Sequence, residues 1–169
     1  LDELLSKAMK WGASDQPRNE DDLGRFGFGL KSASLAQCKL LTVISKGSEG
    51  KINLRKWDVE YLKEINEWDV TDNETPDLAP HIAELKLQKT GTIILWQKLD
   101  KMLESEISDP KFSHRPIIKI REKVKKHLSM IFGNYLDKIN INMPIGNNIN
   151  TLKPWDPFIQ NHLYTDILP

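Results

Sequence analysis

The chain lacks the residues that mark several common classes of protein. It has one cysteine, Cys38, in 169 residues, so no disulfide can form within it, and this usage predicts a reducing, cytoplasmic location. Its four histidines are scattered along the sequence and do not reproduce the spacing of a zinc site. No apolar run approaches the roughly 18 residues that predict a membrane-spanning helix. We therefore expect neither a zinc site nor a membrane protein.

The chain also has no excess of either charge. Its 24 Lys and Arg residues balance 24 Asp and Glu residues, so no overall field attracts nucleic acid or an anionic membrane. With 39% hydrophobic and 28% charged residues, the composition is that of a soluble globular protein. The length is sufficient for one domain and part of another.

The first nine residues already follow a helical pattern. Apolar residues recur at i, i+3, i+4, i+7 and i+8 from Leu1 to Met9, which predicts an amphipathic helix. Neither an initiating Met nor a capping residue precedes it. We expect the sequence to be a piece of a longer protein whose missing part lies upstream.

The rest of the chain alternates between strand-like and helical patterns. Residues 11–22 are polar, contain Gly and Pro, and predict a loop, and residues 30–37 predict a short helix. Residues 115–136 predict a long helix from apolar residues spaced three or four apart. The predicted strands are 39–46, 51–59, 67–70, 92–99, 138–143 and 149–152.

A glycine-rich segment precedes the second predicted helix. Gly24, Gly27 and Gly29 permit close approach of the backbone to an anion, and Lys31 follows them with a mobile positive charge. The spacing excludes a Walker A loop, because Leu30 intervenes before Lys31. It also excludes a dinucleotide fingerprint, because Ser32 stands where the third glycine is needed. Without further information, a structural turn and an anion site are equally well supported.

The sequence around the glycines adds a resemblance to a family. Residues 23–35 (LGRFGFGLKSASL) resemble the second glycine motif of the GHKL ATPases, which include gyrase B, the ninety-kilodalton heat-shock chaperone, histidine kinases and MutL. The Lys31-Ser32 pair is most similar to the MORC branch and its prokaryotic relatives. Thr90-Gly91-Thr92 resembles the Gly-Thr motif of the superfamily. Segments 127–132, 139–142 and 154–158 resemble the region that follows the ATPase domain in MORC-like proteins, and this continuation argues against a histidine kinase.

The resemblance implies an α/β two-layer sandwich with a mixed, mostly antiparallel sheet and helices on one face. Residues 1–101 would be the later half of the ATP-binding domain, with a lid at about 11–23 and a glycine loop at 24–32. Residues 102–169 would be a linking helix and the start of a transducer-like domain.

The resemblance also implies a site for ATP and Mg²⁺. Arg25 would reach the terminal phosphate, Lys31 would face the phosphates, and Thr92 would hydrogen-bond towards adenine. Plain surface charge, for the two basic residues, and an ordinary strand residue, for Thr92, are the alternatives. The implied nucleotide-binding residues are Gly24, Arg25, Phe26, Gly27, Phe28, Gly29, Leu30, Lys31 and Thr92.

The catalytic glutamate, the magnesium-ligating asparagine and the adenine-recognising aspartate of the family belong to motifs upstream of this sequence. We therefore expect no catalytic or metal-binding residue here, negligible hydrolysis by this piece alone, and weak binding of ATP. The resemblance implies that the parent protein closes its lid and forms a homodimer on nucleotide. The alternative is a degenerate GHKL fold that serves as a scaffold without ATPase activity.

Two further features have competing interpretations. The segment 111–126 carries seven basic residues and one acidic residue, which fits a solvated helix face or, as MORC and MutL relatives would suggest, contact with DNA. Trp57, Trp68 and Trp96 fall on strand-like segments and are predicted to fill the core. Cys38 is predicted to be a small buried residue.

Overall fold

The computed structural model describes residues 2–12, 27–99, 115–145 and 148–156. The chain divides into two compact units, Leu1–Ser105 and Glu106–Pro169. The identities predicted for the two parts of the sequence, an ATP-binding half-domain and a transducer-like start, stay predictions.

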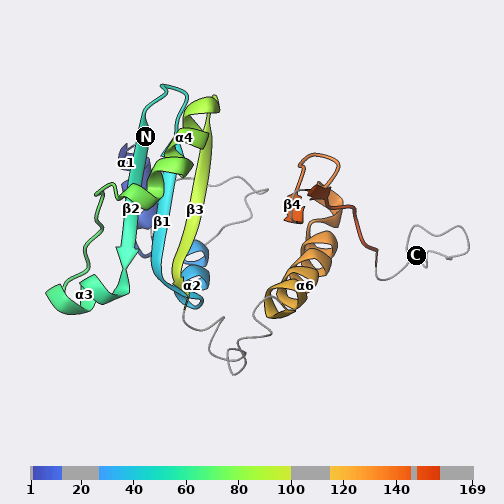
Figure 1. The fold of residues 1–169 in the computed structure, drawn as a ribbon, viewed down its shortest axis with the longest axis horizontal. Helices are drawn as coiled ribbons and strands as arrows, with labels where there is room; N and C mark the ends of the chain where they lie inside the picture. The colour runs from blue at the N-terminus through green and yellow to red at the C-terminus, as the bar shows by residue number, and fades with distance from the viewer. Residues whose placement is uncertain (1, 13–26, 100–114, 146–147, 157–169) are drawn as a thin grey trace, which may run out of the picture. The chain divides into compact units, whose positions relative to one another are not determined.

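The first unit is built around a three-stranded antiparallel sheet with the order β2-β1-β3 (Figure 1). The strands are β1 (Cys38–Lys46), β2 (Ile52–Asp58) and β3 (Gly91–Leu99). The central strand β1 buries four residues in succession, 41–44, because elements cover both of its faces. The sequence predicted all three strands to within one residue at each end, and Cys38 is buried as expected.

One face of the sheet packs against two helices. The helices are α1 (Asp2–Met9) and α2 (Gly29–Leu35), and both were predicted from the sequence. Residues directly opposed on neighbouring strands share a face, so Leu41, Val43 and Trp57 point together towards these helices. They form a core with Leu5 and Met9 of α1. We call this side of the sheet the α1 face.

The other side of the sheet carries a shorter cover, which we call the α4 face. A 3₁₀ turn η1 (Pro76–Leu78) leads into α4 (Ala79–Leu87), and Leu78 and Leu85 pack on Ile44 and Leu54. Figure 1 shows α4 in front of the strands, with α1 and α2 behind them. The predicted α/β arrangement of helices on an antiparallel sheet is confirmed, while α4 adds a helix on a face where none was expected.

The region between β2 and α4 differs from its prediction. It contains a helix, α3 (Val59–Ile65), which buries none of its residues and therefore leaves little apolar pattern in the sequence. The strand expected at 67–70 does not form in the structure. Instead Thr71 makes a single antiparallel bridge with Lys56 at the edge of β2.

The second unit contains α6 (Arg115–Ile131), the 3₁₀ turn η3 (Gly133–Tyr135), and a hairpin of β4 (Asn142–Ile145) and β5 (Asn148–Thr151). The predicted helix ends earlier than expected, because Gly133 begins a tighter turn. The first strand of the hairpin starts at Asn142 rather than at Lys138. None of the described helices has the length and apolar character needed to span a membrane.

Candidate functional site

The glycine segment enters the described structure at Gly27. Its φ of +66° lies in the left-handed region, which glycine adopts without steric cost. Phe28 and Gly29 are exposed, and a Cβ atom built on Gly29 would meet no atom within 4 Å. The backbone at the start of α2 is therefore open to a ligand. The other glycine-segment residues predicted to bind nucleotide, Gly24, Arg25 and Phe26, lie outside the described residues.

Lys31, in the first turn of α2, is almost completely buried. Only 2% of its surface is exposed, and its Nζ donates a hydrogen bond to the carbonyl oxygen of Ala8 at 2.7 Å. Ala8 belongs to the last turn of α1, whose carbonyls have no partner within the helix. Burial lowers the pKa of Lys31, because a charged amine loses its hydration there. In this conformation Lys31 joins α2 to the end of α1, and its contact with phosphate stays a prediction.

Thr92 lies on the α1 face of β3, directly opposite Ser45. Its side chain is exposed, and its hydroxyl is 2.9 Å from the Ser45 hydroxyl. Ile94 and Trp96 follow on the same face of β3 and are also exposed. The indole Nε1 of Trp96 donates to Ser34 Oγ of α2 at 2.9 Å, which connects this strip to the helix that follows the glycines.

The structure brings two predicted parts of the nucleotide site, Thr92 and the helix α2 that follows the glycines, to the α1 face of the sheet. Trp96, which contacts α2, and Thr92 are four residues apart, about 13 Å along an extended strand. Between them Ile94 offers an exposed apolar surface. The α1 face thus has open backbone near α2, an apolar strip along β3, and a hydroxyl pair at the far end of that strip. Sequence reasoning missed Ser45 and the Ala8 carbonyl, because neither a strand serine nor a helix carbonyl carries a local signal.

Four aromatic rings gather beside the glycine segment. Ring centroids lie 5.9 Å apart for Trp11 and Phe28, 5.5 Å for Trp11 and Trp57, and 5.3 Å for Trp57 and Trp68. A hollow of about 460 Å³ is lined in part by Trp57 and Trp68. The prediction that the strand-like tryptophans fill the core is right for Trp57. It is wrong for Trp68, which is 77% exposed in the segment after α3, and for Trp96, which is 44% exposed.

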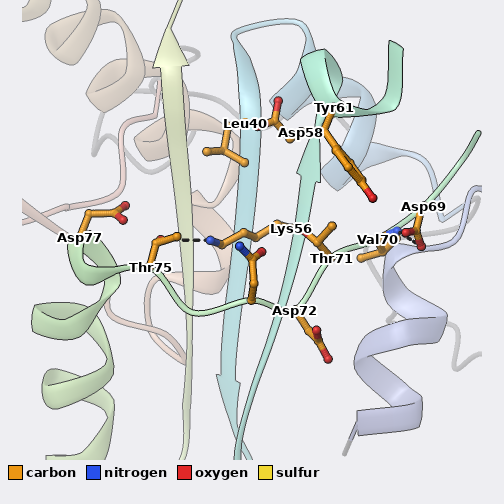
Figure 2. Close-up of a pocket in the computed structure, with 11 residues that line it drawn as sticks. Leu40, Lys56, Asp58, Tyr61, Asp69, Val70, Thr71, Asp72, Thr75 and Asp77 are labelled. Atoms are coloured by element: carbon orange, nitrogen blue, oxygen red, sulfur yellow. Dashed lines mark hydrogen bonds between the residues drawn. The ribbon is translucent and has the colours of Figure 1, made fainter. Parts of the chain in front are cut away.

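A second hollow, of about 610 Å³, lies on the α4 face (Figure 2). Lys56 is 6% exposed there, and its Nζ donates to Thr75 Oγ1 at 3.1 Å. Asp77 lines the same hollow, and hydrogen bonds from Thr75 and Gln97 lower the pKa of its carboxyl. No feature of the sequence had singled out this hollow. The hydrogen bond from Lys56 to Thr75 connects β2 to the residue that precedes η1 across this hollow.

Two other predicted features can be located. Among the described residues, no group of three or more His, Cys, Asp or Glu side chains is placed to hold a metal ion. Lys119, Lys123 and Lys126 are exposed on α6 of the second unit, whereas residues 111–114 lie outside the described structure.

Comparison with known proteins identifies a family for this chain. Neither the curated proteins nor the solved structures contain a match to this chain. The sequence model of the family described as histidine kinase-, DNA gyrase B-, and HSP90-like ATPase matches residues 1–92, which is more than half of the chain. The match confirms the resemblance to the GHKL superfamily that the glycine motif indicated. The chain therefore belongs to the histidine kinase-, DNA gyrase B- and HSP90-like ATPases, and residues 1–92 fall in their ATP-binding domain.

Proposed function

We propose that the chain supplies one part of an ATP–Mg²⁺ site, the part that contacts the phosphates and one edge of the base. The family match over residues 1–92 carries this proposal. Two features of this unit fit a nucleotide: the open backbone at Gly29, and the exposed Thr92 hydroxyl at the end of an apolar strip on the α1 face. The phosphates would lie against the backbone of residues 24–30, and the base near Thr92.

In this proposal Lys31 exchanges its partner when nucleotide binds. Among the described residues its amine donates to one neutral acceptor, the Ala8 carbonyl, and a neutral acceptor compensates a buried cation less well than an anion does. A phosphate oxygen offers the full opposite charge and a stronger hydrogen bond. Arg25 would contact the terminal phosphate, and the lid at 11–23 would close over the nucleotide.

We further propose that the parent protein is cytoplasmic, is closest to the MORC-like prokaryotic ATPases, and forms a homodimer when ATP closes the lid. The Lys31-Ser32 pair that follows the glycines supports this branch. Catalysis and magnesium ligation would come from motifs outside this sequence. The 169-residue piece alone should bind ATP weakly and hydrolyse it negligibly, so calorimetry showing tight binding to the isolated piece would contradict this division of roles.

The test of the proposed function is calorimetric titration of the full-length protein with ATP and Mg²⁺. The variant Gly29→Ala should keep the fold, because its Cβ meets no atom within 4 Å, yet bind ATP more weakly, because the methyl group occupies space next to the open backbone. Gly133→Ala in the second unit is the matched control, since its Cβ also meets nothing within 4 Å. Equal ATP affinity in both variants would argue against a phosphate site at Gly29.

A second candidate function is a GHKL-fold scaffold without ATPase activity. The hydrogen bond from Lys31 to Ala8 favours it, because a lysine committed to a helix end serves packing. Full-length protein that forms dimers but neither binds nor hydrolyses ATP would establish this alternative.

The exposed lysines of α6 support a separate proposal that the second unit contacts DNA. Charge reversal at the exposed Lys123 and the half-buried Lys125 should weaken DNA binding. It should also make the affinity depend less steeply on salt concentration, because fewer phosphate contacts form and fewer counterions are released on binding. Charge reversal at Lys51, in the turn after β1, is the control. A salt titration in which the reversed and parent proteins bind DNA identically would remove the proposal.

A further inference from the structure

The hollow of about 460 Å³ beside α3 has a mostly apolar lining. Its volume lies within the range of small-molecule sites. The apolar residues that line it come from the ends of α2 and β2, from α3 and from the segment after α3: Leu35, Trp57, Val59, Leu62 and Trp68. None of them belongs to the proposed nucleotide site.

The two tryptophans of this lining are incompletely packed. Their ring centroids lie 5.3 Å apart, yet Trp57 is 3% exposed and Trp68 is 77% exposed. The indole Nε1 of Trp57 is buried and has no acceptor among the described residues. Native structures rarely leave a buried donor without an acceptor, or so much of an indole ring in water. Incomplete packing of this kind is expected of a site that closes around a ligand.

The hollow is also lined by one cation and one anion, Lys63 of α3 and Glu67 beyond its end. They are four positions apart, the spacing at which opposite charges pair along a helix. The helix ends before Glu67, because Asn66 adopts the left-handed conformation at the C-cap with a φ of +52°. Within the described part of the chain, Lys63 and Glu67 form no ion pair with each other or with any other residue.

A ligand that matches this lining carries an apolar group, an ammonium and a carboxylate. The apolar group would lie against Trp68, the ammonium would meet Glu67, and the carboxylate would meet Lys63. A ligand with one charge would leave the other lining charge without a counter-ion, and an uncharged ligand would leave both. The complementary molecule therefore has both charges and no net charge.

We propose that this hollow binds a free amino acid with a large apolar side chain. Its ammonium, its carboxylate and its side chain are attached to one carbon atom, so a single small molecule supplies all three groups. Phenylalanine is the probe of choice, because an aromatic ring packs well on the exposed indole of Trp68.

The test is calorimetric titration of the full-length protein with L-phenylalanine and with two analogues that each lack one charge. Phenethylamine lacks the carboxylate, and 3-phenylpropionate lacks the ammonium. Each analogue should bind about three- to tenfold more weakly than phenylalanine, the effect of one charged hydrogen bond that is partly screened by water. Trp68→Ala should weaken the binding of all three ligands, because they share the apolar contact, and its exposed position preserves the fold.

Two variants assign each ligand charge to its residue. Lys63→Met should bind phenylalanine and phenethylamine equally well, because the cation that recognised the carboxylate is gone. Glu67→Gln should bind phenylalanine and 3-phenylpropionate equally well, because the anion that recognised the ammonium is gone. Lys51→Met and Glu49→Gln, at exposed positions between β1 and β2, are the matched controls and should keep the parental differences.

Comparing ligands within one variant cancels any general loss of folded protein. Parental protein that does not bind phenylalanine would overturn the proposal. Analogue differences that survive in both Lys63→Met and Glu67→Gln would also overturn it, because they would place the binding elsewhere. None of these measurements involves ATP, so the outcome is independent of the proposed nucleotide site.

Discussion

The two faces of the sheet differ in the partner of their buried lysine and in how completely their apolar residues are covered. Each buries a lysine: Lys31 on the α1 face bonds to a helix carbonyl, and Lys56 on the α4 face bonds to a threonine hydroxyl. The α4 face closes an apolar core under α4. The α1 face also has a core, but beside it β3 leaves Ile94 and Trp96 exposed.

This difference shows where packing is complete and where it is not. The exposed apolar strip of β3, the hydroxyl pair at its end and the open backbone at Gly29 offer a ligand both apolar contact and hydrogen bonds. The α4 face combines its apolar core with a hollow in which Lys56 donates to Thr75 and Asp77 accepts from Gln97 of β3. The α1 face is therefore the better candidate for function, and the α4 face for support of the sheet.

The largest expected effect compares the two cores. Leu41→Ala on the α1 face and Ile44→Ala on the α4 face each remove a fully buried side chain from β1. Each should lower the free energy of unfolding by about 2–5 kcal/mol, measured by urea denaturation. At a temperature where both variants are folded, only Leu41→Ala should also weaken ATP binding. Equal ATP affinity in the two would contradict the assignment of function to one face.

The second comparison replaces each buried lysine with methionine, which keeps the length of the side chain and removes the charge. Lys31→Met should reduce the affinity for ATP about tenfold to a hundredfold, because a charged hydrogen bond to phosphate is lost. Lys56→Met should leave the affinity within twofold of the parent. Calorimetry on both variants decides the matter, and an unchanged affinity in Lys31→Met would favour the scaffold function.

The third comparison uses two glycines with positive φ. Gly12 has a φ of +67°, and a Cβ there would lie 3.2 Å from Cζ of Phe28, whereas Gly50 has a φ of +80° and open space. Alanine at either position should cost about 1–2 kcal/mol of stability, because the left-handed conformation is strained for a residue with a side chain. Gly12→Ala should cost more and also weaken ATP binding, since it displaces the Phe28 ring beside Gly29. Thermal unfolding of both variants, with calorimetry, tests the contribution of that contact.

The smallest expected effect concerns Asp58, which lines the hollow on the α4 face and caps α3 by accepting from the Glu60 N–H at 3.0 Å. Burial acts to raise the pKa of Asp58, but hydrogen bonds from Lys98 and the Glu60 N–H lower it overall. A lowered folded-state pKa stabilises the protein above about pH 4, and this contribution is lost as the pH falls further.

The variant Asp58→Ala should therefore lose about 1 kcal/mol at neutral pH, the value of a helix cap. Its stability should also decline less steeply than that of the parent as the pH falls below about 4. Urea denaturation at several pH values measures both effects. ATP affinity at neutral pH should not change, because Asp58 is not on the α1 face.

Much of the sheet and its helices could be predicted because periodicity is a local property. β1 and β3 are dominated by β-branched and apolar residues, and α1 has an apolar stripe. The sequence did not predict α3 and α4, because neither has a clear helical period of apolar residues. α3 buries none of its residues and α4 buries only Leu85, so few of their positions need an apolar side chain. Trp68 was misplaced for a related reason, since a tryptophan in a short polar segment has no pattern to show which way it points.

The sequence by itself determined the family, through the glycine motif that ends in Lys31-Ser32, and it determined the positions of β1, β2 and β3 to within one residue at each end. Only the tertiary structure decided that Lys31 lies against Ala8, and that Ser45 stands opposite Thr92. The physical reason is the range of the interactions. Backbone conformation and apolar period are set by neighbouring residues, whereas these two contacts join residues 23 and 47 positions apart and form only when helices and strands pack.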